Sequence, residues 1–527
     1  MKKSVMNQTE NKKSELITVN NPIIWSDVPD PDIIRIGECY YMVSTTMFYT
    51  PGVPIMKSTD LVSWEIVSYV YDILEDNDTC NLQNGKNAYG IGSWAASLRY
   101  NNGIFYVCFM SYDQGKTYIY QTTDIENGTW KRSEFVGIYH DASLLFDDDG
   151  RVYLIHGNGT IRIKELNADA TAFKPGGIDQ VLIETDQSNN IVSAEGSHFY
   201  KIDGKYYVLL IQWPKTGTSR RIELCYRSDS LLGIYESKVV MDDNLNYGNS
   251  GVAQGGIVST PEEEWYALLF QDHGAVGRMP VLLPVTWEDG WPMMGVSGKA
   301  PATITIPTDK KQVGTILAQS DEFNYADNSL NLNWQWNHNP DNDNWSVTER
   351  EGYLRLTTGS LATTIFDARN SLTLRTEGPT CTSEVAIDVS GMKPGDYAGI
   401  SAFQDAFGIV GVRMDKAGNK YIFMAVNGGK GVLDEKENAQ LLGDTIYLKI
   451  DYVFGKVSST GRVSQVDNAS FYYSTDGDNW LPIGTKLSMS YKLTLFTGYR
   501  TALFNYATTE TGGHVDFDYL HYARTEW

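Results

Sequence analysis

The chain has 527 residues, which is more than one ordinary hydrophobic core accommodates, so we expect two domains. Its formal net charge of -22 argues against a nucleic-acid partner, because binding to phosphate depends on Lys and Arg. No stretch has the length and apolar character of a membrane span, so no membrane partner is expected. The five cysteines are widely spaced without a CxxC pair, which predicts neither a zinc site nor a disulfide framework.

Residues 1–20 are polar, contain lysines and lack the apolar core of a signal peptide. We expect them to form a disordered N-terminal segment. As written, the sequence favours a soluble cytoplasmic protein. It is equally compatible with a periplasmic or secreted protein whose native signal has been removed, so the location stays open.

An acidic turn follows, with Asp27, Asp30 and Asp32 within six residues. Pro29 and Pro31 flank Asp30, and proline restricts both its own backbone and that of the residue before it. One interpretation is a polar turn before a strand, since Asp and Pro are ordinary turn residues. The other is a rigid turn that presents a carboxylate into a central cavity.

A strand–turn–strand pattern then recurs five times at a spacing of roughly 45–65 residues, the range typical of propeller blades. Each copy has an apolar leading strand, a second strand rich in Tyr and Val, and a more polar third strand. Glycine stands in the first turn of four copies, as hairpin turns prefer. The copies begin near Asp32, Ala96, Ala142, Gly196 and Gln254. This pattern predicts a five-bladed β-propeller.

The pattern breaks at residues 301–311, where prolines and charged residues indicate a domain edge. Strand-like segments without the blade motif continue beyond it, for example residues 353–358 and 383–389. We therefore predict an all-β protein. Residues 21–305 form the propeller, and residues 306–527 form a β-sandwich of the jelly-roll, lectin-like kind.

The leading strands of a propeller converge on its axis, so residues at their starts meet in space. Blades one, three and four place Asp30, Asp141 and Glu195 there, while blades two and five place Trp94 and Gln254. Convergent carboxylates repel one another, and at least one pKa should be raised. One acid that donates a proton and one carboxylate that activates water perform glycoside hydrolysis, and a third can tune the other two.

Three blocks, residues 29–37, 140–150 and 194–201, resemble the signature blocks of glycoside hydrolase family 43. Residues 368–375 resemble the C-terminal sandwich of its β-xylosidase/arabinofuranosidase branch. The resemblance implies an inverting enzyme with Asp30 as general base, Glu195 as general acid and Asp141 as the residue that modulates the acid's pKa. Asp27 and Asp32 then become supporting residues.

The same resemblance suggests substrate-binding residues. Arg278 matches the family arginine that steadies the modulator and a sugar hydroxyl, although it could instead form a surface ion pair. Phe48, Trp94 and Trp213 are candidate sugar platforms or, alternatively, blade-packing residues. His273 lies near the place where relatives have an axial histidine on a calcium ion or a water. No cofactor is expected to be required, no metal ligand is assigned, and a structural calcium ion is left open.

These observations predict an exo-acting, inverting glycoside hydrolase. Its expected action is removal of terminal non-reducing α-L-arabinofuranosyl residues from plant hemicellulose, namely arabinoxylan, xyloglucan or their oligosaccharides. The alternative within the class is a β-D-xylosidase or a dual-activity enzyme. The alternative from another class is a non-catalytic carbohydrate-binding propeller, which would be expected to lack one of the three acids.

Overall fold

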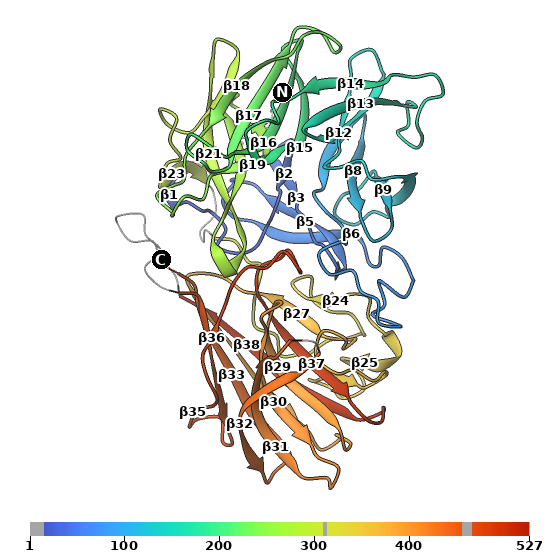
Figure 1. The fold of residues 1–527 in the computed structure, drawn as a ribbon, viewed down its shortest axis with the longest axis vertical. Coiled ribbons are helices and arrows are strands. Elements are labelled where there is room, and N and C mark those ends of the chain that lie inside the picture. The colour runs from blue at the N-terminus through green and yellow to red at the C-terminus, as the bar shows by residue number, and fades with distance from the viewer. Residues whose placement is uncertain (1–14, 309–313, 430, 456–465, 526–527) are drawn as a thin grey trace, which may run out of the picture.

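The computed structural model describes residues 15–308, 314–429, 431–455 and 466–525. Within these ranges the chain forms strands and two short 3-10 turns, η1 (Gly274–Val276) and η2 (Asn342–Asn344). Figure 1 shows two β domains stacked along the long axis of the molecule, with the propeller above the sandwich. The prediction of an all-β protein with these two domain types is confirmed.

Five four-stranded antiparallel sheets form the blades. Blade one contains β2 (Asp32–Ile36), β3 (Cys39–Val43), β5 (Gly52–Ser58) and β6 (Glu65–Tyr71). Blade two contains β7 (Ser97–Asn101), β8 (Ile104–Ser111), β9 (Lys116–Thr122) and β10 (Lys131–Val136). Blade three contains β11 (Ser143–Phe146), β12 (Val152–Asn158), β13 (Thr160–Leu166) and β14 (Asp179–Glu184). Blade four contains β15 (Asn190–Ile202), β16 (Lys205–Pro214), β17 (Ile222–Ser228) and β18 (Glu236–Met241). Blade five contains β19 (Ala253–Ser259), β20 (Trp265–Asp272), β21 (Arg278–Glu288) and β22 (Trp291–Met294).

The first hairpin of each of the first four blades turns at a glycine with positive φ, for example 60° at Gly37 and 84° at Gly103. Glycine adopts this conformation without a steric penalty, which is why it marked the repeats in the sequence. In the second strands of blades two and four, Val107 and Leu209 are fully covered by neighbouring blades.

The segment predicted to be disordered is ordered in part. Strand β1 (Glu15–Asn20) pairs antiparallel with β23 (Thr303–Thr308), and Ile17 and Val19 pack against the core of blades one and five. The prediction for residues 1–20 is therefore wrong from residue 15 onward, and residues 1–14 lie outside the described residues. The alternation of apolar side chains in this short strand was masked by its polar surroundings. The predicted boundary between residues 305 and 306 falls inside β23.

The sandwich consists of two sheets around a large apolar core. The first contains β24 (Gln335–Asn337), β27 (Leu372–Arg375), β29 (Asp396–Phe403), β30 (Gly408–Met414), β31 (Lys420–Asn427), β32 (Leu433–Leu441) and β37 (Arg500–Ala507). The second contains β25 (Trp345–Ser346), β26 (Leu354–Thr357), β28 (Thr380–Asp388), β33 (Thr445–Val453), β34 (Asn468–Ser474), β35 (Leu481–Pro482), β36 (Leu487–Ser488) and β38 (His514–Arg524).

The first sheet of the sandwich also takes in a strand from the propeller. Strand β4 (Tyr49–Thr50) lies between β3 and β5 in the chain, yet it pairs with β24. Tyr49 is fully buried, and the guanidinium of Arg500 lies 3.6 Å from its ring centroid. The two domains are thus joined by backbone hydrogen bonds and a buried interface.

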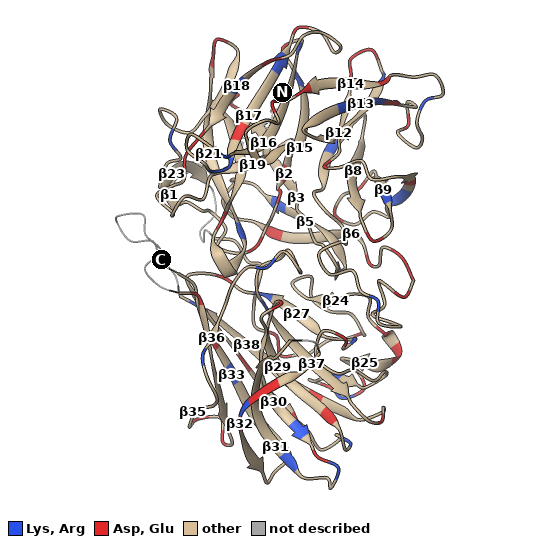
Figure 2. Cartoon of the chain, viewed as in Figure 1, with Lys and Arg blue, Asp and Glu red and all other residues tan. Residues whose placement is uncertain are grey.

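Acidic and basic side chains are distributed over both domains, as Figure 2 shows, so the negative net charge is not confined to one element. A dispersed excess of this kind favours solubility over the binding of one charged partner. Within the described residues, no helix is long and apolar enough to cross a membrane.

Candidate active site

Two of the three predicted acids stand on the same unusual backbone conformation. Asp30 and Asp141 have φ values of 51° and 47°, and each precedes the leading strand of its blade by two residues. Asp tolerates the left-handed region better than most side chains do. The conformation turns each carboxyl toward the propeller axis, where both line a small cavity together with Gln254.

Glu195 is placed differently from the sequence-based expectation. In blade four the left-handed position belongs to Gly196, with φ of 69°, so Glu195 comes one residue earlier than Asp30 and Asp141 do. The pairing of β15 with β16 shifts register on both sides of Glu195. A Cβ atom on Gly196 would lie 2.8 Å from the Gln254 side chain, so the position requires glycine. The prediction that all three acids share one structural position is therefore wrong by one residue for Glu195.

Asp30 is held by a buried arginine. Arg278 Nη1 donates to both carboxylate oxygens of Asp30, at 2.8 and 2.9 Å, and Thr45 Oγ1 donates to Oδ2 at 2.6 Å. Arg278 is 4% exposed, which rules out the surface ion pair considered from the sequence. Its partner is Asp30 and not the expected modulator, Asp141. These three hydrogen bonds from two donors fix the orientation of the Asp30 carboxyl group.

Asp141 is as deeply buried as Asp30. Its Oδ2 accepts a hydrogen bond from the Gly196 amide at 3.0 Å, while Oδ1 is buried without a hydrogen-bond partner. Burial raises the pKa of Asp141 to about 7, and the negative charges of Glu195 and Asp30 add to that rise although His140 opposes it. The expected raised pKa is thus found on the central carboxyl.

Glu195 is held through one of its two oxygens. His140 Nε2 lies 3.0 Å from Glu195 Oε2, and the Asn158 amide donates to the same oxygen. On the other side of the imidazole, Nδ1 lies 2.9 Å from the Tyr112 hydroxyl. Burial lowers the pKa of His140, but the carboxylates of Asp141 and Glu195 outweigh it and raise the value to about 9. Both ring nitrogens are thus engaged, one with Glu195 and one with Tyr112.

Asp32 is a structural residue that links three of the blades. It is fully buried and accepts hydrogen bonds from the Leu98 amide at 2.8 Å, from Arg99 at 2.6 Å and from His198 at 3.0 Å. Burial alone would raise the pKa of Asp32, but Arg99 and His198 lower it to about 2. Asp32 thus stays ionised as a structural residue that ties blades one, two and four together.

Two of the predicted sugar platforms lie beside the acids. Trp94 packs edge-on against Tyr112, with ring centroids 4.9 Å apart, and lies 6.0 Å from the His140 ring. Trp213 lies on β16, the partner strand of Glu195, and the guanidinium of Arg221 covers one ring face at 5.1 Å. Both indoles are partly exposed, so their role as platforms stays a prediction.

Phe48 and His273 do not reach the site. Phe48 is 4% exposed and stacks on His338 at 5.1 Å, in the interface between the domains. His273 is 5% exposed, lies 3.9 Å from the Tyr247 ring and bonds to Gln271 at 2.8 Å. Neither ring has a face left for a sugar, so these two assignments are wrong. Both side chains were predicted from their position in the chain, but they are buried in packing contacts between blades or between the domains.

A loop of the sandwich completes the wall of the site; family analogy led us to expect such a loop, but the sequence did not show which residues form it. Phe496 packs against Trp94 at 5.1 Å, and its ring lies 4.7 Å from the Arg278 guanidinium. Asp27 anchors this loop, since Oδ2 accepts from the Gly498 amide at 2.8 Å and Oδ1 from the Arg278 amide at 2.7 Å. The acidic turn therefore supplies one residue to the reaction centre and another to the domain contact.

Three side chains have ligand atoms close enough together to hold a metal ion, namely His140, Asp141 and Glu195, within 4.8 Å. Nε2 of the imidazole, however, is already engaged with Glu195 Oε2, and the Asn158 amide donates to the same oxygen. We therefore assign this cluster to acid–base chemistry. The structural calcium ion left open by the sequence remains untested.

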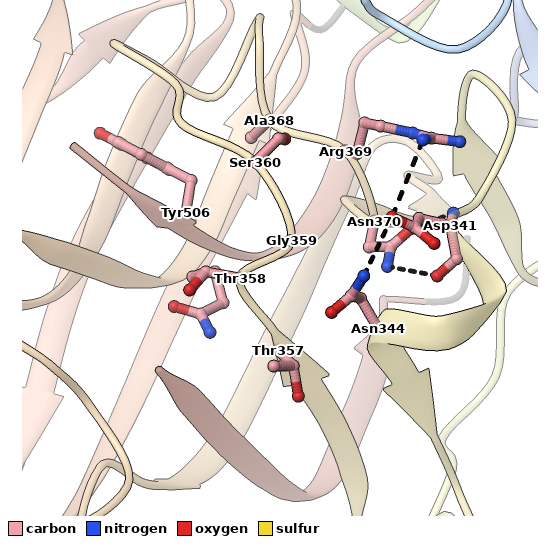
Figure 3. Close-up of a pocket in the computed structure, with 11 residues that line it drawn as sticks. Asp341, Asn344, Thr357, Thr358, Gly359, Ser360, Ala368, Arg369, Asn370 and Tyr506 are labelled. Atoms are coloured by element: carbon pink, nitrogen blue, oxygen red, sulfur yellow. Dashed lines mark hydrogen bonds and ion pairs between the residues drawn. The ribbon is translucent and has the colours of Figure 1, made fainter. Parts of the chain in front are cut away.

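A second small cavity lies entirely within the sandwich and is drawn in Figure 3. Polar side chains line most of it. Asn344 donates to the Asp341 carboxylate at 2.9 Å, and Asn370 donates to the Asp341 carbonyl at 2.9 Å. These groups hold the surrounding loops to one another and lie in a different domain from the three acids.

The propeller axis thus holds an arginine-paired carboxylate and a second, separately held carboxyl group, and two carboxyl groups are what glycosidases as a class use. The comparisons with known proteins agree with this class. The chain belongs to glycoside hydrolase family 43, because residues 19–292 match Glycosyl hydrolases family 43 and residues 320–523 match the Beta xylosidase C-terminal Concanavalin A-like domain.

Its relatives carry two kinds of name. The chain is 30% identical to a Beta-xylosidase of Formosa agariphila, over 96% of this chain and 90% of that protein. It is 31% identical to a Non-reducing end alpha-L-arabinofuranosidase of Bacteroides ovatus, over 64% of this chain and 65% of that protein. A solved structure, Bifunctional GH43-CE of Bacteroides eggerthii, shares 46% identity with a TM-score of 0.89. That match covers 97% of this chain but 64% of the other, so the chain spans about two thirds of that relative.

Proposed function

We propose that this family 43 glycosidase is an inverting, exo-acting enzyme that releases terminal non-reducing α-L-arabinofuranosyl residues from plant hemicellulose. The observation that carries the proposal is the different environment of the two outer acids. Asp30 is paired with a buried arginine, which fixes the position of the carboxyl group proposed to activate water. Glu195 is on another blade, more exposed than Asp30, with one oxygen held by His140 and Asn158.

The reaction follows from these positions. Glu195 gives its proton to the glycosidic oxygen as the bond from that oxygen to the anomeric carbon breaks. Asp30 takes a proton from a water whose oxygen bonds to the anomeric carbon from the opposite face. Such an arrangement requires room for the water, typically about 6.5–9.5 Å between the two carboxyl groups. The charges of Asp30 and Glu195 raise the pKa of Asp141, in keeping with a role of Asp141 in tuning the acid.

The closed wall of the site supports attack at a chain end. Phe496 and Trp94 pack together above the acids, so domain contacts limit the space on that side. A pocket closed on one side admits the terminal sugar of a chain more readily than an internal sugar. The proposed substrates are accordingly oligosaccharides and polymer ends of arabinoxylan or xyloglucan.

β-D-Xylosidase activity is the second candidate, and the name of the Formosa agariphila relative favours it. The two terminal sugars present similar hydroxyl geometry. The ratio of rates on aryl α-L-arabinofuranoside and aryl β-D-xyloside distinguishes them. We expect the furanoside to be hydrolysed faster, and a faster reaction on the xyloside would replace the first candidate with the second.

The assignment of Glu195 is tested by Glu195→Gln, which keeps the shape of the side chain but cannot donate a carboxylic proton. We expect hydrolysis of a pentosyl oligosaccharide to fall by about 10²–10⁴-fold, the usual contribution of a general acid. Glu184→Gln, at an exposed glutamate on the outer strand of blade three, is the matched control and should keep its activity. An unchanged rate for Glu195→Gln would show that this residue is not the acid and would reopen the carbohydrate-binding alternative.

A further inference from the structure

A chain of three side chains from three blades ends on the proposed acid. Tyr112 directly follows β8 in blade two, His140 precedes β11 in blade three, and Glu195 lies on β15 in blade four. The Tyr112 hydroxyl lies 2.9 Å from His140 Nδ1, and His140 Nε2 lies 3.0 Å from Glu195 Oε2. Both nitrogens of the imidazole are thus engaged, which fixes the orientation of the ring.

Packing holds the same chain in place. Trp94 lies against both rings, with centroid distances of 4.9 Å to Tyr112 and 6.0 Å to His140. The His140 side chain is 16% exposed, so the imidazole has little freedom to leave its position. Locked rotamers and fixed hydrogen bonds are what a reacting group needs from its supporting residues.

The two oxygens of Glu195 are treated differently. Oε2 receives hydrogen bonds from His140 and from Asn158. Among the described residues, no hydrogen bond to Oε1 is seen. A carboxyl oxygen that already accepts from two N–H donors cannot conveniently carry the acidic proton, because that proton would meet the donors' hydrogens. The proton of a protonated Glu195 therefore belongs on Oε1.

We propose that Tyr112 and His140 are positioning residues that hold Glu195 by Oε2, so that Oε1 carries and delivers the transferable proton. This inference rests on the proposed role of Glu195 as the general acid. In the step, the proton leaves Oε1 for the glycosidic oxygen while the bond to the anomeric carbon breaks. The resulting carboxylate keeps its hydrogen bonds from His140 and Asn158, and solvent returns a proton after the product leaves.

The dependence of the rate on the leaving group tests the proposal. A leaving group of low basicity, such as 2,4-dinitrophenolate, departs without a proton, whereas phenolate or a sugar alkoxide needs one. We therefore expect Tyr112→Phe and His140→Gln to lower kcat on phenyl pentoside by about 10–100-fold, in line with the cost of misplacing a catalytic group. The same variants should lose less than about threefold on the 2,4-dinitrophenyl pentoside, whose departure needs no general acid.

The chain offers a matched control pair. Tyr139 and His156 pack against each other at 4.9 Å in blade three, next to the proposed residues, but no contact between them and the acids is seen. Tyr139→Phe and His156→Gln should change both substrates equally. Tyr112→Phe removes a single hydroxyl oxygen, so it keeps the test decisive even if His140→Gln fails to fold.

Three outcomes are distinguishable. A loss concentrated on phenyl pentoside supports the proposal. An equal loss on both substrates, or no loss for either variant, overturns it and leaves Tyr112 and His140 with a structural role only. Glu195→Gln calibrates the assay, because an equal loss on both substrates for that variant would instead refute the proposed role of the acid itself.

Discussion

Single residues in this site occupy backbone conformations that most side chains avoid. Asp30 and Asp141 are both left-handed, and Gly196 takes the same conformation in blade four. Strained positions persist where the surrounding structure holds them, and they gather at functional sites. The consequence here is that two acids point at the axis while Glu195, one residue earlier, is held on a separate side by His140 and Asn158.

The buried central carboxyl should make stability depend on pH. Asp141 has a pKa of about 7 in the folded chain, against 3.8 for an unperturbed aspartate, so its contribution to stability is present below about pH 4 and is lost as the pH rises through 7. Asp141→Asn removes this loss. We compare the unfolding free energy of Asp141→Asn with that of the native chain at each pH. By the linkage of pKa to stability, this difference should favour the variant by about 2 kcal/mol more at pH 8.5 than at pH 5.5. Urea unfolding at the two pH values measures it, and an equal gain at both would contradict the pKa shift.

Asp30 and Asp141 could be located because both stand at the same place before the leading strand of a blade, and Glu195 lies one residue away from that place. Their partners could not. His140 adjoins Asp141 in the sequence, but its contact with Glu195 depends on the one-residue displacement in blade four. That displacement comes from a register shift in the pairing of β15 with β16, which no pattern in the sequence predicts. Phe48 was misassigned because an aromatic residue that follows a blade strand can pack in a domain interface as readily as it can line a sugar site.

At the scale of elements, the loop that precedes β37 links the sandwich to the chemistry. Phe496 adopts φ of 60°, packs on Trp94 and covers the arginine that holds Asp30. The strands on either side could be predicted from alternation and turn residues. The residues of the loop could not be identified from the sequence, because the loop carries no motif and contacts residues more than 200 positions earlier in the chain.

Phe496→Ala tests the contribution of this loop. We expect the KM for terminal pentosides to rise by about tenfold with a smaller change in kcat, because one aromatic contact contributes roughly 0.5–1.5 kcal/mol beyond area burial. Leu493→Ala, at a residue of the same loop that is 72% exposed, is the control and should leave KM unchanged. Equal KM values for Phe496→Ala and the native chain would show that the loop does not line the substrate site.

At the scale of the whole molecule, the two domains share a sheet. Strand β4 of the propeller pairs with β24 of the sandwich, and Asp27 accepts from the Gly498 amide across the same interface. The sequence predicted both domains, because repeats and strand alternation are local signals. It did not predict that the domains share a sheet, because β4 is two residues long and resembles part of a turn.

This shared sheet predicts cooperative unfolding. Domains joined by a loose linker would melt separately, whereas domains with a buried common interface should unfold together. We expect a single calorimetric transition for the full chain, with a calorimetric enthalpy that matches the van't Hoff enthalpy. Two resolved transitions would show that the interface contributes little to stability.

The configuration of the first-formed sugar tests the central claim most directly. If Glu195 protonates the leaving oxygen while Asp30 activates a water on the opposite face, one displacement occurs and the anomeric configuration inverts. Proton NMR during the first turnovers of an aryl α-L-arabinofuranoside, before mutarotation, should therefore show β-L-arabinose. First-formed α-L-arabinose would mean retention, and it would contradict the proposed pairing of acid, base and water.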